Sequence, residues 1–124
     1  MEIVTGAGPA RAEIEAPAKP AFLLVLTHGA GGGVATKDVL AVRRAGLEAG
    51  AAVALVTQPY RVRGARAPGS PDRQDAAWLE IISALRENYP GLPLVQGGRS
   101  NGARVACRTA LAAGASGVLA LAFP

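Results

Sequence analysis

The chain has 124 residues, half of them hydrophobic, which is the size and composition of one globular domain. Its net charge of +4 comes without aromatic interleaving or any nucleic-acid motif, so we expect no nucleic-acid partner. No apolar run reaches the roughly 18 residues of a membrane span, and no signal peptide opens the chain, so we expect a cytoplasmic protein with no membrane partner.

Residues 1–20 are rich in Ala, Pro and Gly. Two short segments, residues 2–4 and 12–15, have strand character and predict a leading hairpin at the edge of a sheet. The glycines between them resemble the start of a dinucleotide-binding loop, but Arg11 stands where that fingerprint has Gly or Ala. No helix-length pattern follows before Pro17, so we reject a dinucleotide site.

Two continuous apolar runs, residues 21–27 and 51–57, predict strands buried on both faces, because they are short and do not alternate. The first run leads into the loop 28–33, His-Gly-Ala-Gly-Gly-Gly, which can bring bare backbone close to a ligand. A phosphate-binding loop is excluded, because Lys37 lacks the preceding Gly and the following Ser or Thr. Residues 36–49 predict a helix between the two strands.

A Pro-, Gly- and Arg-rich loop over residues 61–71 is too long for a simple connection and predicts a pocket wall. Its arginines are either solvated or raise the local concentration of an anionic substrate. Residues 72–88 predict a helix, and residues 92–96 a third buried strand. The packed face of that helix consists of Trp78, Ile81, Ile82 and Leu85.

The stretch 94–104 predicts a strand that breaks at glycines, presents one serine and enters an Ala-rich helix. Within it, Gly98-Arg99-Ser100-Asn101-Gly102 fits G-x-S-x-G, the nucleophile elbow. The turn is so tight that a side chain two residues before or after the serine would collide with neighbouring backbone. The helix start adds free N–H groups and partial positive charge where an oxyanion would form. Alternatively, Ser100 only caps the following helix.

The remaining residues predict a helix over 100–113 and a fourth buried strand over 118–123. The single Cys107 lies on this helix, where we expect a small core residue in a reducing compartment. The alternation of strands and helices predicts a single α/β domain over residues 1–124. We expect a three-layer sandwich with a mostly parallel sheet.

The loop 28–32, the segment Gln58-Pro59-Tyr60-Arg61 and the elbow region 97–104 together resemble the α/β-hydrolase superfamily. More narrowly, they are similar to a small branch of dienelactone-hydrolase-like proteins. The resemblance covers about residues 20–124 and implies an α/β-hydrolase fold that lacks its C-terminal strands. Asn101 and Ala103 depart from the branch, which has a larger apolar residue and a glycine at these positions.

The resemblance implies that Ser100 is the nucleophile and that the backbone N–H groups of Ala30 and Asn101 form the oxyanion hole. No metal or cofactor is implied. The only histidine, His28, would shape the oxyanion loop, and a role as the general base is the alternative. The other loop-shaping residues would be Gly29, Gly98 and Gly102.

The family's acid and base follow the nucleophile along the chain, yet residues 101–124 contain no Asp, Glu or His. We therefore expect the chain to be the amino-terminal part of a longer hydrolase, with self-association through its last, unpaired strand. The first functional reading is a serine hydrolase that acts through an acyl-enzyme on a small-molecule ester, thioester or lactone. The second is a catalytically inert binding or scaffold module of the same fold.

Overall fold

The computed structural model describes residues 1–123 as six strands and four helices. The strands are β1 (Glu2–Thr5), β2 (Gly8–Glu15), β3 (Phe22–Thr27), β4 (Ala51–Thr57), β5 (Leu94–Arg99) and β6 (Gly117–Leu121). The helices are α1 (Lys37–Glu48), α2 (Pro59–Val62), α3 (Pro71–Asn88) and α4 (Asn101–Ala113). All strands join one sheet in the order β1-β2-β4-β3-β5-β6.

The centre of the sheet is parallel, and its β1-β2-β4 side is antiparallel. Strand β3 lies between β4 and β5, where Leu24 is in register with Val53 on one side and Val95 on the other. Both faces of β3 are covered, because Val25 belongs to one core cluster and Leu24 to the other. This explains the unbroken apolar run of the strand.

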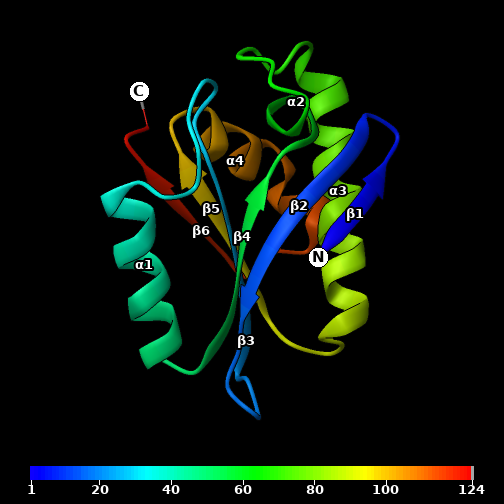
Figure 1. The fold of residues 1–124 in the computed structure, drawn as a ribbon. Coiled ribbons are helices and arrows are strands. Elements are labelled where there is room, and N and C mark those ends of the chain that lie inside the picture. The colour runs from blue at the N-terminus through cyan, green and yellow to red at the C-terminus, as the bar shows by residue number, and fades with distance from the viewer. Residues whose placement is uncertain (124) are drawn as a thin grey trace.

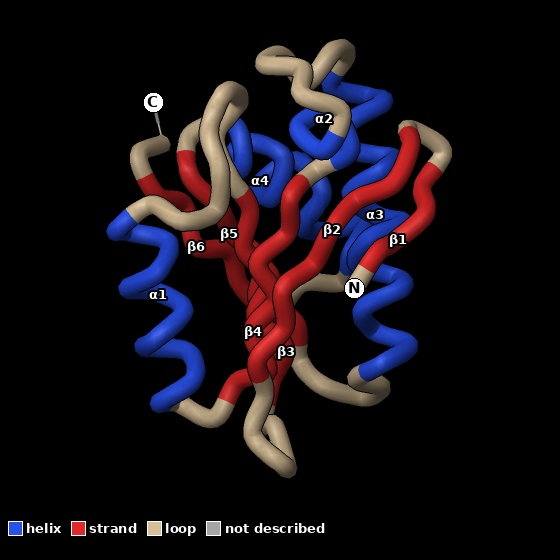
Figure 2. Tube along the Cα trace, viewed as in Figure 1, coloured by secondary structure: helices blue, strands red, loops and turns tan. Residues whose placement is uncertain are grey.

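Helices cover both faces of the sheet, with α1 on one face and α3 and α4 on the other (Figures 1 and 2). The predicted face of α3 is confirmed, since Trp78, Ile81, Ile82 and Leu85 are all buried in the core on the α3 and α4 side. The predicted three-layer arrangement with a mostly parallel sheet is therefore confirmed. No helix in residues 1–123 is long and apolar enough to cross a membrane.

Three local features differ from the predictions. Strand β5 continues through the glycines to Arg99, because Gly97 and Gly98 pair with β6 and β3. The predicted loop after β4 begins with the short helix α2, which has Pro59 at its start. Cys107 is exposed and not a core residue, because it lies on the outer face of α4.

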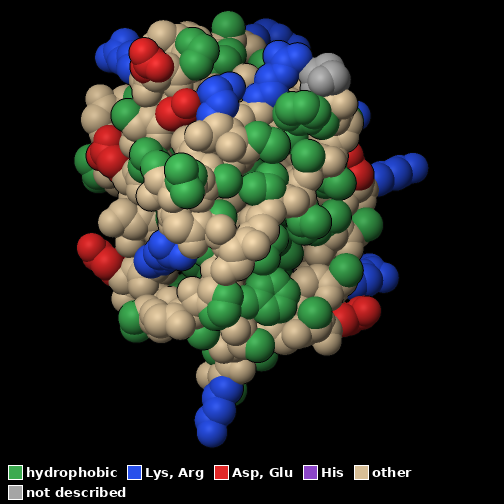
Figure 3. Space-filling model, turned by 180° about the vertical axis from the view of Figure 1, so that it is seen from behind, with side chains coloured by type: hydrophobic (Ala, Val, Ile, Leu, Met, Phe, Trp, Pro, Cys, Tyr) green, Lys and Arg blue, Asp and Glu red, His purple; other side chains and the backbone are tan. Residues whose placement is uncertain are grey.

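Strand β6 forms the edge of the sheet and pairs only with β5 among the described residues. The prediction of a fully buried strand is wrong, since Leu119 is 38 % exposed and Phe123 beyond it is 52 % exposed. Seen from behind, hydrophobic side chains spread over the middle of the molecular surface (Figure 3). The predicted self-association through this edge stays a prediction.

Candidate active site

Ser100 forms the turn between β5 and α4 in a backbone conformation that residues other than glycine rarely adopt. Its φ is 54° and its ψ is −111°. A Cβ added at Gly98 would lie 2.8 Å from the Thr27 carbonyl oxygen, and one at Gly102 would lie 2.6 Å from the His28 carbonyl oxygen. The collisions predicted for an elbow are present at both glycine positions.

The backbone of Ser100 is fixed on both sides. Its N–H donates to the Leu121 carbonyl at 2.8 Å, and its carbonyl accepts from the Arg104 N–H at 3.1 Å. Its side chain forms no capping hydrogen bond with α4. The alternative reading, in which Ser100 serves only as a helix cap, is therefore not supported by the hydrogen bonds of residues 1–123.

The loop 28–33 lies directly against the elbow. A Cβ added at Gly29 would be 3.6 Å from the Ser100 Cβ and 3.5 Å from the Arg99 carbonyl oxygen. Within residues 1–123, the N–H groups of Ala30 and Asn101 donate to no other group. The structure thus brings Gly29 and Ser100 together and leaves both predicted oxyanion donors unused, while their role stays a prediction.

His28 is fully buried and uses both ring nitrogens. Nε2 accepts from the Gln58 backbone N–H at 2.9 Å, so Nδ1 carries the proton and donates to the Gly29 carbonyl at 2.8 Å. Burial is the main cause that lowers the imidazole pKa below 6.5, and the positive charge of Arg61 lowers it further. A neutral ring with no free nitrogen fits a loop-shaping role better than that of a general base.

Two arginines connect the loops around Ser100. The Nε of Arg61 donates to the Gly32 carbonyl at 2.9 Å and so ties the loop 28–33 to α2. The Nε of Arg99 bonds to the Asp38 carboxylate at 3.1 Å and ties the elbow to α1. The Thr36 hydroxyl lowers the pKa of Asp38 most, and Arg99 lowers it further, so this carboxylate stays ionised.

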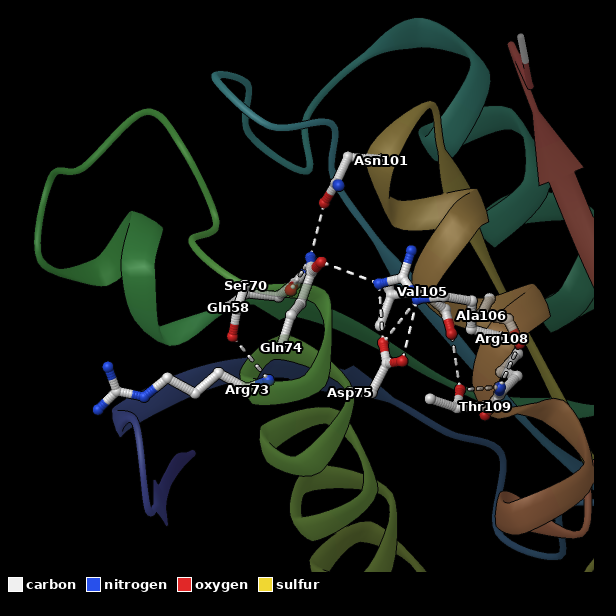
Figure 4. A network of polar contacts seen from close by, with 11 residues as sticks. Gln58, Ser70, Arg73, Gln74, Asp75, Asn101, Val105, Ala106, Arg108 and Thr109 are labelled. Carbon is white, nitrogen blue, oxygen red and sulfur yellow. Dashed lines mark hydrogen bonds and ion pairs between the residues drawn. The ribbon is translucent and has the colours of Figure 1, made fainter.

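A network of side-chain amides holds Asn101, the residue after the serine (Figure 4). The Gln74 Nε2 donates to the Asn101 Oδ1 at 2.6 Å and to the Gln58 Oε1 at 2.8 Å. Gln58 in turn donates to the Thr27 hydroxyl at 3.2 Å, and Arg108 donates to the Gln74 Oε1 at 3.1 Å. The network joins the ends of β3 and β4 to the first turns of α3 and α4.

Sequence reasoning assigned no site role to Gln58, although it lies in the segment that carries the resemblance, and did not single out Gln74. A signal was available for Gln74, because it lies four residues before Trp78 and therefore on the buried face of α3, where a polar side chain needs a partner. Gln58 directly follows a buried strand, but nothing in the order of residues indicates that its amide meets α3.

Comparison with known proteins shows which proteins this architecture resembles. The profile of a family described as an alpha/beta hydrolase domain matches residues 20–124. The chain is similar to a lidless α/β serine hydrolase from Xanthomonas campestris, with 22% identity and a TM-score of 0.79 over 100% of this chain and 60% of that one. It is also similar to an α/β serine hydrolase homologue from Coxiella burnetii, with 15% identity and a TM-score of 0.85 over 100% of this chain and 62% of that one.

A third similar structure is the dienelactone hydrolase from Anabaena variabilis, with 17% identity and a TM-score of 0.77 over 97% of this chain and 60% of that one. No curated protein sequence matches significantly. The chain spans 60% to 62% of the length of these three structures. The predicted α/β-hydrolase fold is confirmed, and the structures that share it include a dienelactone hydrolase.

Proposed function

Because this chain belongs to the alpha/beta hydrolase domain family, we propose that it carries the nucleophile of a serine hydrolase acting on esters, thioesters or lactones. The observation that supports this most strongly is the strained backbone conformation of Ser100, with a φ of 54°, at the turn between β5 and α4. Such strain persists only where the surrounding structure enforces it, and it concentrates at functional sites. The neighbouring hydrolase structures support the same reaction class.

In the proposed reaction the Ser100 Oγ attacks the acyl carbon while a base takes its proton. The N–H groups of Ala30 and Asn101 stabilise the resulting oxyanion. They lie in the loop against the serine and at the first position of α4, where the helix dipole adds positive potential. The leaving alcohol or thiol departs with the proton, and water then releases the acid from the acyl-enzyme. This chemistry requires neither a metal nor a cofactor.

The base for this reaction is not supplied by residues 101–124, which contain no Asp, Glu or His. His28 is also a poor candidate, because both of its ring nitrogens are engaged. The engagement of both His28 ring nitrogens favours a second candidate function, a catalytically inert binding or scaffold module. In that module, Ser100 and the loop 28–33 would hold an anion or a partner.

A fluorophosphonate probe distinguishes the two functions, since labelling breaks a P–F bond only at an activated serine. The 124-residue chain is incubated with the probe at increasing concentrations of imidazole, which acts as an external base, and the labelled residue is located by mass spectrometry. We expect imidazole-dependent labelling that Ser100→Ala abolishes and that replacement of an exposed serine, Ser83→Ala, leaves unchanged. Absence of labelling at Ser100 at every imidazole concentration would favour the inert module.

We also propose that the protein acts in the cytoplasm and self-associates through β6. The partly exposed edge of β6 supports self-association, because its unpaired backbone groups offer a template for another strand. Sedimentation velocity of the wild type and of Leu119→Lys tests this. Replacement of the exposed Leu119 by a charged residue should shift the protein toward the monomer.

A further inference from the structure

We infer that the cavity between the β1–β2 turn, the segment 63–70 and the start of α3 binds a small amphipathic anion, a carboxylate or phosphate on an apolar stem. The cavity has a volume of about 560 Å³, within the range of small-molecule sites. Ser100 is not among the described residues that line it, so the cavity is separate from the candidate active site. Gln74 lies at the boundary, because it lines the cavity and also bonds to Asn101.

The inner wall of the cavity is apolar. Helix α3 contributes Ala77, Trp78 and Ile81, and α2 contributes Pro59 and Tyr60. Burial raises the pKa of Tyr60 to about 12, so its hydroxyl adds no negative charge. Trp78 and Ile81 are themselves buried in the core, so an aromatic or aliphatic group in the cavity would bury apolar surface mainly on Ala7, Ala67 and Pro68, which line it and are exposed or half-buried.

Two arginines bring positive charge to the cavity. Arg63 and Arg73 both line it, and neither forms an ion pair within residues 1–123. Arg63 Nη1 donates to the Ala7 carbonyl at 2.7 Å, which fixes one side of its guanidinium group. The Arg73 side chain extends away from the amide network (Figure 4).

The acidic group next to the cavity, Glu80, is engaged with backbone. The described residues that line the cavity include no Asp or Glu. The nearby Glu80 carboxylate accepts a hydrogen bond from the Gly6 backbone N–H at 3.2 Å, on the turn between β1 and β2. By contrast, Arg43, Arg99 and Arg108 are all paired with carboxylates elsewhere in the molecule.

These features together select the ligand class. A guanidinium group binds carboxylate or phosphate through paired, charge-assisted hydrogen bonds. A free inorganic anion would leave the exposed or half-buried Ala7, Ala67 and Pro68 uncovered, whereas a neutral apolar molecule would give Arg63 and Arg73 no anionic partner. A ligand with an anionic head and an apolar stem satisfies both parts of the cavity.

The test uses the 124-residue chain and two probes, 4-phenylbutyrate and phenyl phosphate, with 4-phenylbutan-1-ol as the neutral control. Trp78 is the only tryptophan, so its fluorescence reports on the cavity directly. We expect a saturable change with at least one anion and binding of the alcohol that is weaker by about tenfold or more. Preference for one of the two anions identifies the head group.

Matched variants locate the binding. Arg63→Gln and Arg73→Gln should each weaken anion binding by about tenfold, the effect of losing a charge-assisted hydrogen bond. Arg44→Gln makes the same charge change on α1, across the sheet, and should leave binding unchanged, with circular dichroism confirming that each variant is folded. Ser100→Ala should also bind normally, which separates this inference from the proposed function.

Three results would overturn the inference. The first is the absence of a saturable signal with either anion. The second is equal binding of the neutral alcohol. The third is wild-type affinity in both folded arginine variants.

Discussion

Two glycine-rich segments face each other at the candidate site, yet their glycines meet very different surroundings. In the elbow, a Cβ at Gly98 or Gly102 would lie 2.8 Å or 2.6 Å from a backbone carbonyl oxygen. In the loop 28–33, a Cβ at Gly29 would make an ordinary contact at 3.5 Å, and one at Gly33 would meet nothing within 4 Å. Both segments are rich in glycine, but only the elbow leaves no room for a side chain at its glycine positions.

The difference comes from what each segment packs against. The elbow glycines contact the carbonyl groups of Thr27 and His28, which leave β3 at the centre of the sheet and cannot move without breaking its pairing. In the loop 28–33, the backbone oxygens next to Gly29 and Gly32 lie at ordinary contact distances of 3.5 Å and 3.9 Å, and the closest group, beside Gly31, is the flexible Arg66 guanidinium. A glycine is therefore required where fixed backbone would lie within 3 Å of a Cβ, and is tolerant to change where the neighbour is farther away or can move.

The largest effect is expected for Gly102→Ala. The new methyl group would contact the His28 carbonyl oxygen and the Thr27 methyl group, so α4 would have to move away from β3. We expect a loss of about 3 kcal/mol in the free energy of unfolding, despite the higher helix propensity of alanine. Urea denaturation measures it, and a variant as stable as the wild type would contradict the role of this contact.

The second prediction concerns the pH dependence contributed by His28, which holds the loop 28–33. Its folded-state pKa is below 6.5, so below pH 6.5 the unfolded chain binds a proton that the folded chain does not. Stability should therefore fall as pH falls from 6.5, by up to about 1.4 kcal/mol per pH unit, until the folded-state pKa is passed. Urea denaturation between pH 7.5 and 5 measures the slope.

His28→Gln is the control for this slope, because His28 is the only histidine in the chain. The variant should be less stable at pH 7.5 but should lose little further stability between pH 6.5 and 5. An unchanged slope in the variant would show that other groups cause the pH dependence.

The third prediction addresses the connection between the elbow and α3. Gln74→Leu removes the hydrogen bonds to Asn101 and Gln58 and leaves their amide oxygens without this donor. We expect a loss of about 1.5 kcal/mol in unfolding free energy. A double-mutant cycle with Asn101→Ala should give a coupling energy of about 1 kcal/mol, whereas additive effects would show that the two side chains do not interact.

The smallest effect is expected for Gly33→Ala, at the open end of the loop. Its methyl group meets no atom within 4 Å, and its φ lies outside the range that strains other residues. The free energy of unfolding should change by less than about 0.5 kcal/mol. A larger loss would mean that both glycine-rich segments are equally constrained, which removes the contrast between them.

Much of the central fold was predictable because its signals are local. The apolar runs of β3 and β4 and the spacing of Trp78 and Ile81 each lie within one element, and the structure confirms them. The elbow was also predictable, since its glycines and serine lie within one turn.

The missed features depend on contacts between distant segments or on an ambiguous pattern. The bond between Gln74 and Asn101 needs two helix starts to meet, which residue order does not reveal. Helix α4 is rich in alanine on both faces, so its pattern does not show that Cys107 points outward. The exposure of β6 could not be predicted, because its apolar sequence is the same whether the strand lies at the centre or at the edge of a sheet.

The position of β3 has a consequence for synthesis on the ribosome. Both of its neighbours, β4 and β5, follow it in the chain, and the hairpin of β1 and β2 joins the sheet only through β4. When β3 leaves the ribosome, this apolar strand therefore has no partner until β4 emerges. Such non-local pairing slows folding and exposes the strand to aggregation, so a chaperone that shields β3 during translation should raise the yield of folded protein.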